Sequence, residues 1–182
     1  GLEASFEYEL RPNLILSGAY RQRILGNRDE VGSIARSTLP PVRREGQRYG
    51  AESGGGIENL SLSWYGRPGR DLYSRVSLGY LERMYGGVSA EVLWKPVDSQ
   101  FALGAEVNYA TQRDFDLGFG FQDYNAVTGH VSAYYDLDNG FEAQVDIGQY
   151  LAGDIGATFS LDREFENGWK VWGVLHSNGC AV

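Results

Sequence analysis

Four carboxylates would be able to do chemistry together if they lay close in space: Glu91, Glu106, Glu142 and Asp146. Each falls on the polar side of a segment in which polar and apolar residues alternate. A glycosidase uses two carboxyl groups about 5–9.5 Å apart, one as the acid and one as the base or nucleophile. Positions on separate segments do not establish that separation. A carboxylate-based glycoside-active enzyme stays an alternative, but solvated or lumen-lining carboxylates are favoured, so the sequence predicts a protein that is not an enzyme.

His130 lies on the same polar side of its segment as Ser132 and Tyr134, but no order of catalytic residues can be assigned to it. A histidine that lines a pore or is held by hydrogen bonds is favoured. The chain has two histidines and one cysteine, Cys180, which are too few for a disulfide framework or a Cys-based zinc site. Lipase, zincin, P-loop and EF-hand motifs are absent from the sequence. We therefore expect no metal and no cofactor.

A long segment, residues 22–56, carries a net positive charge in a chain whose net charge is −8. It is rich in arginine and glycine. Two interpretations stay open: a loop that meets an anionic polymer, and a solvated loop without a ligand. The arginines that would contact such a polymer are Arg36, Arg43, Arg44 and Arg48. The acidic balance of the whole chain argues against nucleic acid as a partner, because nucleic-acid binding needs basic patches.

The elements that must position these residues are strands. Almost every stretch alternates with a period of two, as where Phe101, Leu103 and Val107 face one way and Glu106 and Asn108 the other. The 25 glycines and 5 prolines, with 12 Tyr, 8 Phe and 4 Trp, also favour β-structure with tight turns. About ten strands are expected, over residues 6–10, 14–20, 57–65, 72–82, 88–95, 100–112, 126–136, 141–149 and 155–165, with a last one from Trp169. The predicted fold is all-β, an antiparallel up-and-down meander.

The connections between the expected strands alternate between short and longer ones. Two of the short ones contain Asn-Gly, Asn139-Gly140 and Asn167-Gly168, which predicts type I′ hairpins. The long connections are residues 22–56 and 113–124. Alternate connections of a meander lie at the same end, so one end has only tight turns, as expected of an outer-membrane barrel.

Strand length and aromatic positions bear on whether the apolar faces meet lipid or a protein core. Several expected strands run about ten residues, the length that crosses a bilayer at a tilt. Aromatic residues such as Trp64, Trp94, Phe141 and Trp169 lie near strand ends, where barrels carry interfacial girdles. No apolar run is long enough for a transmembrane helix. The sequence favours an outer-membrane β-barrel, or part of one, over the alternative of a soluble carbohydrate-binding β-sandwich.

The segment from Glu58 to Val171 also resembles a known family, the YjbH-like exopolysaccharide biosynthesis proteins of Gram-negative outer membranes. The motifs that carry the resemblance are Ser74–Glu82, Met84–Ser89, Glu91–Pro96, Asp123-Tyr124 with Gly129-His130, Asp136–Gly140, Gly148–Asp154 and Arg163–Trp169. The resemblance implies an outer-membrane barrel linked to secretion or assembly of an extracellular polysaccharide, and it implies no catalytic residues. It also implies that the chain is a C-terminal portion of a longer protein. The family pattern is expected to continue after Val171, whereas here an irregular tail is expected over residues 176–182.

Together these observations predict one β-barrel domain, or a fragment of a larger barrel, over residues 1–182. The expected function is non-enzymatic help in exporting a polysaccharide across the bacterial outer membrane. The expected partners are the exopolysaccharide, outer-membrane lipid and other polysaccharide-secretion proteins. The residues expected to contact the polysaccharide are Arg36, Arg43, Arg44, Arg48, Glu106, His130 and Asp146.

Overall fold

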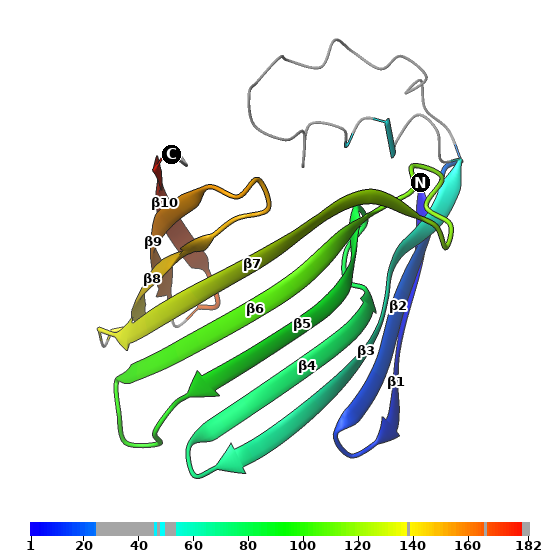
Figure 1. Cartoon of the computed structure of the whole chain (residues 1–182). Coiled ribbons are helices and arrows are strands. Elements are labelled where there is room, and N and C mark those ends of the chain that lie inside the picture. Colours follow the sequence, from blue (N-terminus) through cyan, green and yellow to red (C-terminus); the bar gives the residue numbers. More distant parts are fainter. Residues whose placement is uncertain (25–45, 47, 50–53, 138, 166, 180–182) are drawn as a thin grey trace. The chain divides into compact units, whose positions relative to one another are not determined.

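The computed structural model describes residues 1–24, 46, 48–49, 54–137, 139–165 and 167–179. Arg36, Arg43 and Arg44 lie outside the described residues. Ten strands follow one another along the chain (Figure 1). Their bounds are β1 (Leu2–Arg11), β2 (Leu14–Gln22), β3 (Gly55–Gly69), β4 (Leu72–Tyr80), β5 (Tyr85–Trp94), β6 (Phe101–Arg113), β7 (Phe121–Asp136), β8 (Phe141–Gln149), β9 (Ile155–Glu164) and β10 (Lys170–Gly179).

All ten strands belong to one sheet in the order β1-β2-β3-β4-β5-β6-β7-β8-β9-β10. The pairs β1–β2, β2–β3, β7–β8, β8–β9 and β9–β10 are antiparallel. This confirms the all-β meander that the period-two alternation predicts. Among the described strands, β1 and β10 each pair with one neighbour, so the sheet is open at both edges. No helix in the described part of the chain is both long and apolar enough to span a membrane.

The chain divides into two compact units. The first unit comprises Gly1–Trp64, Val76–Ser89 and Tyr109–Ala126. The second comprises Tyr65–Arg75, Ala90–Asn108 and Val127–Val182.

In the first unit, small polar side chains meet across neighbouring strands. The hydroxyl groups of Ser17 and Ser61 lie 3.2 Å apart, and those of Ser63 and Ser77 lie 2.8 Å apart. The ladder shifts register between Ala19 and Tyr20 of β2. The buried apolar side chains of this unit are few, and most lie near the connections after β4 and β6. They are Ala19, Tyr49, Met84, Tyr85, Ala110 and Leu117.

The second unit shows the two-residue alternation most clearly, but with the exposure reversed from that of a water-soluble sheet. On β7, Val127 is 56% exposed and its polar neighbour Thr128 only 5%. On β9, Ile155 is 61% exposed, whereas Gly156 is buried. In a soluble sheet with one solvated face, the apolar face is the buried one. On these two strands the apolar side chains are the more exposed ones, and the small and polar ones lie on the less exposed side, which we call the polar face.

The hairpin connections agree with the sequence at one Asn-Gly pair and differ at the other. Asn139 and Gly140 have φ angles of 53° and 75°, as the central residues of a type I′ turn require. At the second pair, the Gly168 N–H donates to the Phe165 carbonyl, so Asn167 and Gly168 are the last two residues of a four-residue turn. The Asn167 side chain accepts from the Trp169 N–H and holds that turn.

The end of the chain differs in part from the expected irregular tail over residues 176–182. β10 continues to Gly179, because His176 pairs with Thr158 of β9 and the ladder extends to Ile155. Paired neighbours on β9 therefore carry the strand further than its sequence pattern indicates. Residues 180–182 lie outside the described residues.

Candidate functional site

The polar face of the second unit carries a row of interacting side chains that begins on β6. Glu106 lies against His130 of β7, with 3.3 Å between Glu106 Oε1 and His130 Nδ1. The Asn108 amide donates to Glu106 Oε1 and to Thr128 Oγ1, at 3.0 and 3.2 Å. These contacts fix the carboxylate and the imidazole relative to each other. They also bring together Glu106 and His130, which the sequence placed on polar faces without showing that they meet.

The row continues from His130 to β10 through Tyr150, which follows β8. The Tyr150 ring packs edge-on against both His130 and His176, with centroid distances of 4.8 and 5.3 Å. The Thr158 hydroxyl joins it on β9, at 2.9 Å from Tyr150 Oη and 2.7 Å from His176 Nδ1. We call Glu106, His130, Tyr150, Thr158 and His176 the polar row. It gives carboxylate, imidazole and hydroxyl groups that can exchange hydrogen bonds with sugar hydroxyls.

Asp146 of β8 lies directly beside this row. Its carboxylate accepts hydrogen bonds from the Ser132 hydroxyl and from the Gln144 amide, the latter at 2.8 Å. The register pairs Asp146 with Ser132 on β7 and with Thr158 on β9. Asp146 therefore shares the polar face with the polar row.

Sequence reasoning missed Tyr150, Thr158 and His176 as members of this site. Alternation along β9 predicts that Thr158 lies on the polar face. His176 joins the polar row because it pairs with Thr158 across β9 and β10. That pairing depends on the register between strands, which no single strand encodes. Tyr150 lies beyond the end of β8, where the two-residue pattern stops.

The other two carboxylates that could have served a glycosidase have different surroundings. Glu91 is paired with the Arg75 guanidinium, and Glu142 is exposed at the start of β8. Within the described part of the chain, no group of three or more His, Cys, Asp or Glu side chains is arranged to hold a metal ion.

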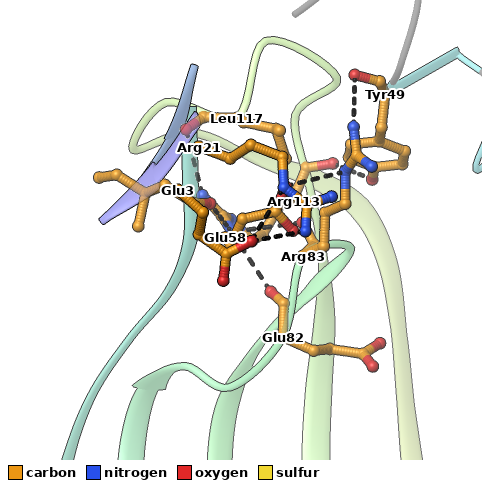
Figure 2. Close-up of polar contacts among 9 residues, drawn as sticks. Glu3, Arg21, Tyr49, Glu58, Glu82, Arg83, Arg113 and Leu117 are labelled. Carbon is orange, nitrogen blue, oxygen red and sulfur yellow. Dashed lines mark hydrogen bonds and ion pairs between the residues drawn. The ribbon is translucent and has the colours of Figure 1, made fainter. Parts of the chain in front are cut away.

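A second cluster lies in the first unit, where a fully buried arginine ties the strand connections together. The Arg113 guanidinium donates to the carbonyls of Ile57, Glu82, Arg83, Leu117 and Gly118, at 2.8–3.3 Å. It also lies 4.2 Å from the centroid of the Tyr80 ring. Figure 2 shows Arg113 at the centre of the cluster, with Glu82, Arg83 and Leu117 around it. Arg113 thus fixes the connections after β4 and β6.

The same cluster anchors a described part of the segment 22–56. The Tyr49 ring is fully buried, its hydroxyl donates to the Arg113 carbonyl, and Arg83 donates to the Tyr49 carbonyl at 3.1 Å (Figure 2). Arg48, one of the predicted polymer-contacting arginines, has its guanidinium 4.0 Å from the centroid of the Phe115 ring. Arg48 is therefore placed at the connection between β6 and β7.

Glu58 balances two of the arginines in this cluster. Its carboxylate lies 3.6 Å from Arg21 Nε and 3.8 Å from Arg83 Nε, and Arg21 also binds Glu3 at 2.6 Å (Figure 2). The Glu58 side chain is 15% exposed. These charges are mutually neutralised, which indicates a structural role for the cluster.

Comparison with known proteins shows which family the chain belongs to. Residues 1–174 match the model of the YjbH family, whose description is "Exopolysaccharide biosynthesis protein YbjH". The chain belongs to the YjbH family. This confirms the resemblance carried by the motifs between Glu58 and Val171. Membership relates the chain to exopolysaccharide biosynthesis.

One relative of this YjbH-family chain is "Uncharacterized lipoprotein YjbH" of Escherichia coli (strain K12), which is 33% identical over 181 residues. The match covers 95% of the chain and 26% of that protein, so the chain spans about a quarter of its relative's length. No solved structure matches the chain.

Proposed function

We propose that the strands form part of an outer-membrane β-barrel, with the apolar face toward lipid and the polar face toward water. The reversed exposure of the second unit carries this proposal. Three apolar side chains of this unit are more than half exposed: Val127, Val131 and Ile147. In a water-soluble protein they would be in contact with water. The strands have 9–16 residues, and about 9–11 suffice to cross a bilayer.

The soluble β-sandwich alternative needs a second sheet over the apolar face. The described strands belong to one sheet, and its apolar face in the second unit is exposed. A lipid environment accounts for that exposure without a second sheet. The relative's name, which includes "lipoprotein", also supports a membrane location.

The function we propose for this YjbH-family chain is to assist secretion or assembly of an extracellular polysaccharide without catalysing a reaction. The family description supports a role connected with exopolysaccharide. The proposed partners are the polysaccharide, outer-membrane lipid and other polysaccharide-secretion proteins. Glu106, His130 and Asp146 would offer weak hydrogen bonds to passing sugar units, while Arg36, Arg43, Arg44 and Arg48 would attract acidic groups.

The membrane part of the proposal is tested by cell fractionation and gel mobility. The protein is expected in the outer-membrane fraction, and its mobility is expected to change between unheated and boiled samples, since a folded barrel resists detergent at low temperature. Recovery in the aqueous fraction with a single mobility would overturn the barrel.

The polymer part is tested by replacing Arg36, Arg43, Arg44 and Arg48 with Gln. Less surface polysaccharide is expected, because the charges that attract acidic sugars are removed. A control replaces Arg11, Arg67 and Arg70, which lie in or within three residues of the short connections after β1 and β3, and should leave export unchanged. Equal export in both variants and the parent would show that these four arginines have no role in export.

The absence of catalysis is tested with purified protein and isolated polymer. No new reducing ends are expected during incubation. Chain cleavage that is lost in Glu106→Gln or Glu142→Gln would instead establish the glycoside-active alternative, because those carboxylates are its proposed acid and base.

A further inference from the structure

Among the described residues that the register pairs along the apolar face of β7–β10, Arg163 is the one charged side chain. The register places Arg163 of β9 between Phe141 of β8 and Val171 of β10. The other residues paired along this face are uncharged, and most are apolar. They are Gly129, Val131, Ala133, Tyr135, Ala143, Val145, Ile147, Gln149, Ile155, Ala157, Phe159, Leu161, Gly173, Leu175, Ser177 and Gly179.

Arg163 is held in place by aromatic rings. Its guanidinium carbon lies 4.6 Å from the centroid of the Phe141 ring and 4.2 Å from that of Phe165. Cation–π contacts of this kind orient a guanidinium while leaving its N–H donors available. The Arg163 Nε is buried and makes no hydrogen bond, and no carboxylate of the described residues forms an ion pair with this side chain. The nearby Glu164 is instead paired with Lys170 at 2.9 Å.

In the proposed barrel, Arg163 would lie near the membrane–water boundary. It is the last residue but one of β9, next to the two short hairpin connections. Trp169, the residue just before β10, is 72% exposed, as expected of an aromatic girdle. An open pocket of about 900 Å³ lies at these connections, and its lining includes Arg163, Phe165 and the carboxylate of Glu164, which is paired with Lys170.

We propose that Arg163 binds the phosphate group of a membrane phospholipid at the turn end of β8–β10. This proposal rests on the proposed function, since it requires the apolar face to meet lipid. A planar guanidinium matches phosphate oxygens with two parallel hydrogen bonds. The acyl chains would lie along the exposed apolar side chains of the same strands, and the headgroup would occupy the pocket beside the hairpins.

The test measures phospholipid binding to the protein in dodecyl maltoside, a detergent whose headgroup has no phosphate. Dihexanoyl phosphatidylglycerol is titrated in, and bound lipid is counted by native mass spectrometry. Arg163→Gln is expected to raise the dissociation constant about tenfold or more, because charge-assisted bonds are lost. Arg163→Lys keeps the charge but loses the bidentate geometry, so an intermediate affinity is expected.

The matched control is Arg75→Gln, which removes an arginine from a strand on the face of Ser77, away from the apolar face. It should bind lipid like the parent. Equal affinities of the parent, Arg163→Gln and Arg75→Gln would overturn the proposal. Displacement of the lipid by an equal concentration of inorganic phosphate would also overturn it, because the site would then recognise a free anion.

Heat-dependent gel mobility of each variant separates this test from that of the proposed function. A parent protein without the mobility shift would contradict the barrel itself. A parent and an Arg163→Gln variant that both shift, with equal lipid affinity, would contradict only the phosphate site.

Discussion

At the scale of single residues, Arg113 combines complete burial with five backbone carbonyl acceptors for its two terminal guanidinium nitrogens. Its guanidinium bonds to five carbonyl oxygens that belong to three separate parts of the first unit. Leaving those oxygens without a donor would cost free energy, because buried polar groups lose their bonds to water. The energetic role of Arg113 is therefore to make the connections after β4 and β6 mutually dependent.

Arg113→Gln should lower the free energy of unfolding by about 3 kcal/mol, since a shorter amide reaches fewer of the five carbonyls. Urea unfolding of the protein in lipid vesicles, followed by tryptophan fluorescence, measures the change. Arg11→Gln is the control, because Arg11 is exposed at the end of β1 and should change the free energy by less than about 0.5 kcal/mol. Equal midpoints for the two variants would contradict the role assigned to Arg113.

For the candidate site, the sequence predicted the strand face on which each residue lies, but not the contacts between residues of different strands. Alternation correctly placed Glu106, His130 and Asp146 on polar faces, because the direction of a side chain follows from its parity along the strand. The contact between Glu106 and His130 depends on register, as does that between Thr158 and His176. The role of these residues in binding polysaccharide stays a prediction.

At the scale of elements, two glycines let neighbouring strands of the first unit approach closely. Gly79 and Gly87 have φ angles of 133° and 150°, which side-chain-bearing residues rarely adopt. A Cβ at Gly87 would overlap the Tyr109 carbonyl, and one at Gly79 would overlap the Leu60 carbonyl. Since these atoms are backbone, they cannot move aside as a side chain would.

Gly87→Ala is therefore expected to destabilise the sheet by at least about 2 kcal/mol, from strain and overlap together. The control is Gly173→Ala on β10, where a Cβ would meet no atom within 4 Å. Heat-dependent gel mobility gives the folded fraction, and urea midpoints give the stability. A Gly87→Ala variant as stable as Gly173→Ala would show that β5 does not need glycine at this position.

The elements themselves were largely predictable, and the exceptions have local causes. All ten expected strands are present, because alternation is strong and turn residues separate the segments. The type I′ expectation failed at Asn167-Gly168, where the Asn167 side chain accepts a backbone hydrogen bond instead. The end of β10 was missed because its pairing with β9, rather than its own pattern, determines its length.

At the scale of the whole molecule, the sequence pattern left two environments open for the apolar faces, a protein core or lipid. The second unit narrows the choice, because large apolar side chains are exposed there while Thr128 and Gly156 are buried. Alternation separates an apolar face from a polar face, but it does not show which of the two is exposed, so it cannot distinguish a protein core from lipid. The structure adds the exposure of each face. Substitutions at two adjacent residues of one strand, which point to opposite faces, can test the environment of each.

Val131 and Ser132 provide that test, because they are neighbours on β7 with opposite directions. Val131 is 59% exposed, so Val131→Arg would change the stability of a water-soluble sheet by less than about 0.5 kcal/mol. If Val131 meets lipid, the same change should cost about 2–4 kcal/mol, the cost of Arg near the middle of a membrane. Ser132→Arg should be far milder, because its guanidinium would lie beside the Asp146 carboxylate on the polar face. Urea unfolding in vesicles compares the two variants, and equal stabilities would place both faces in water and rule out a lipid-facing sheet.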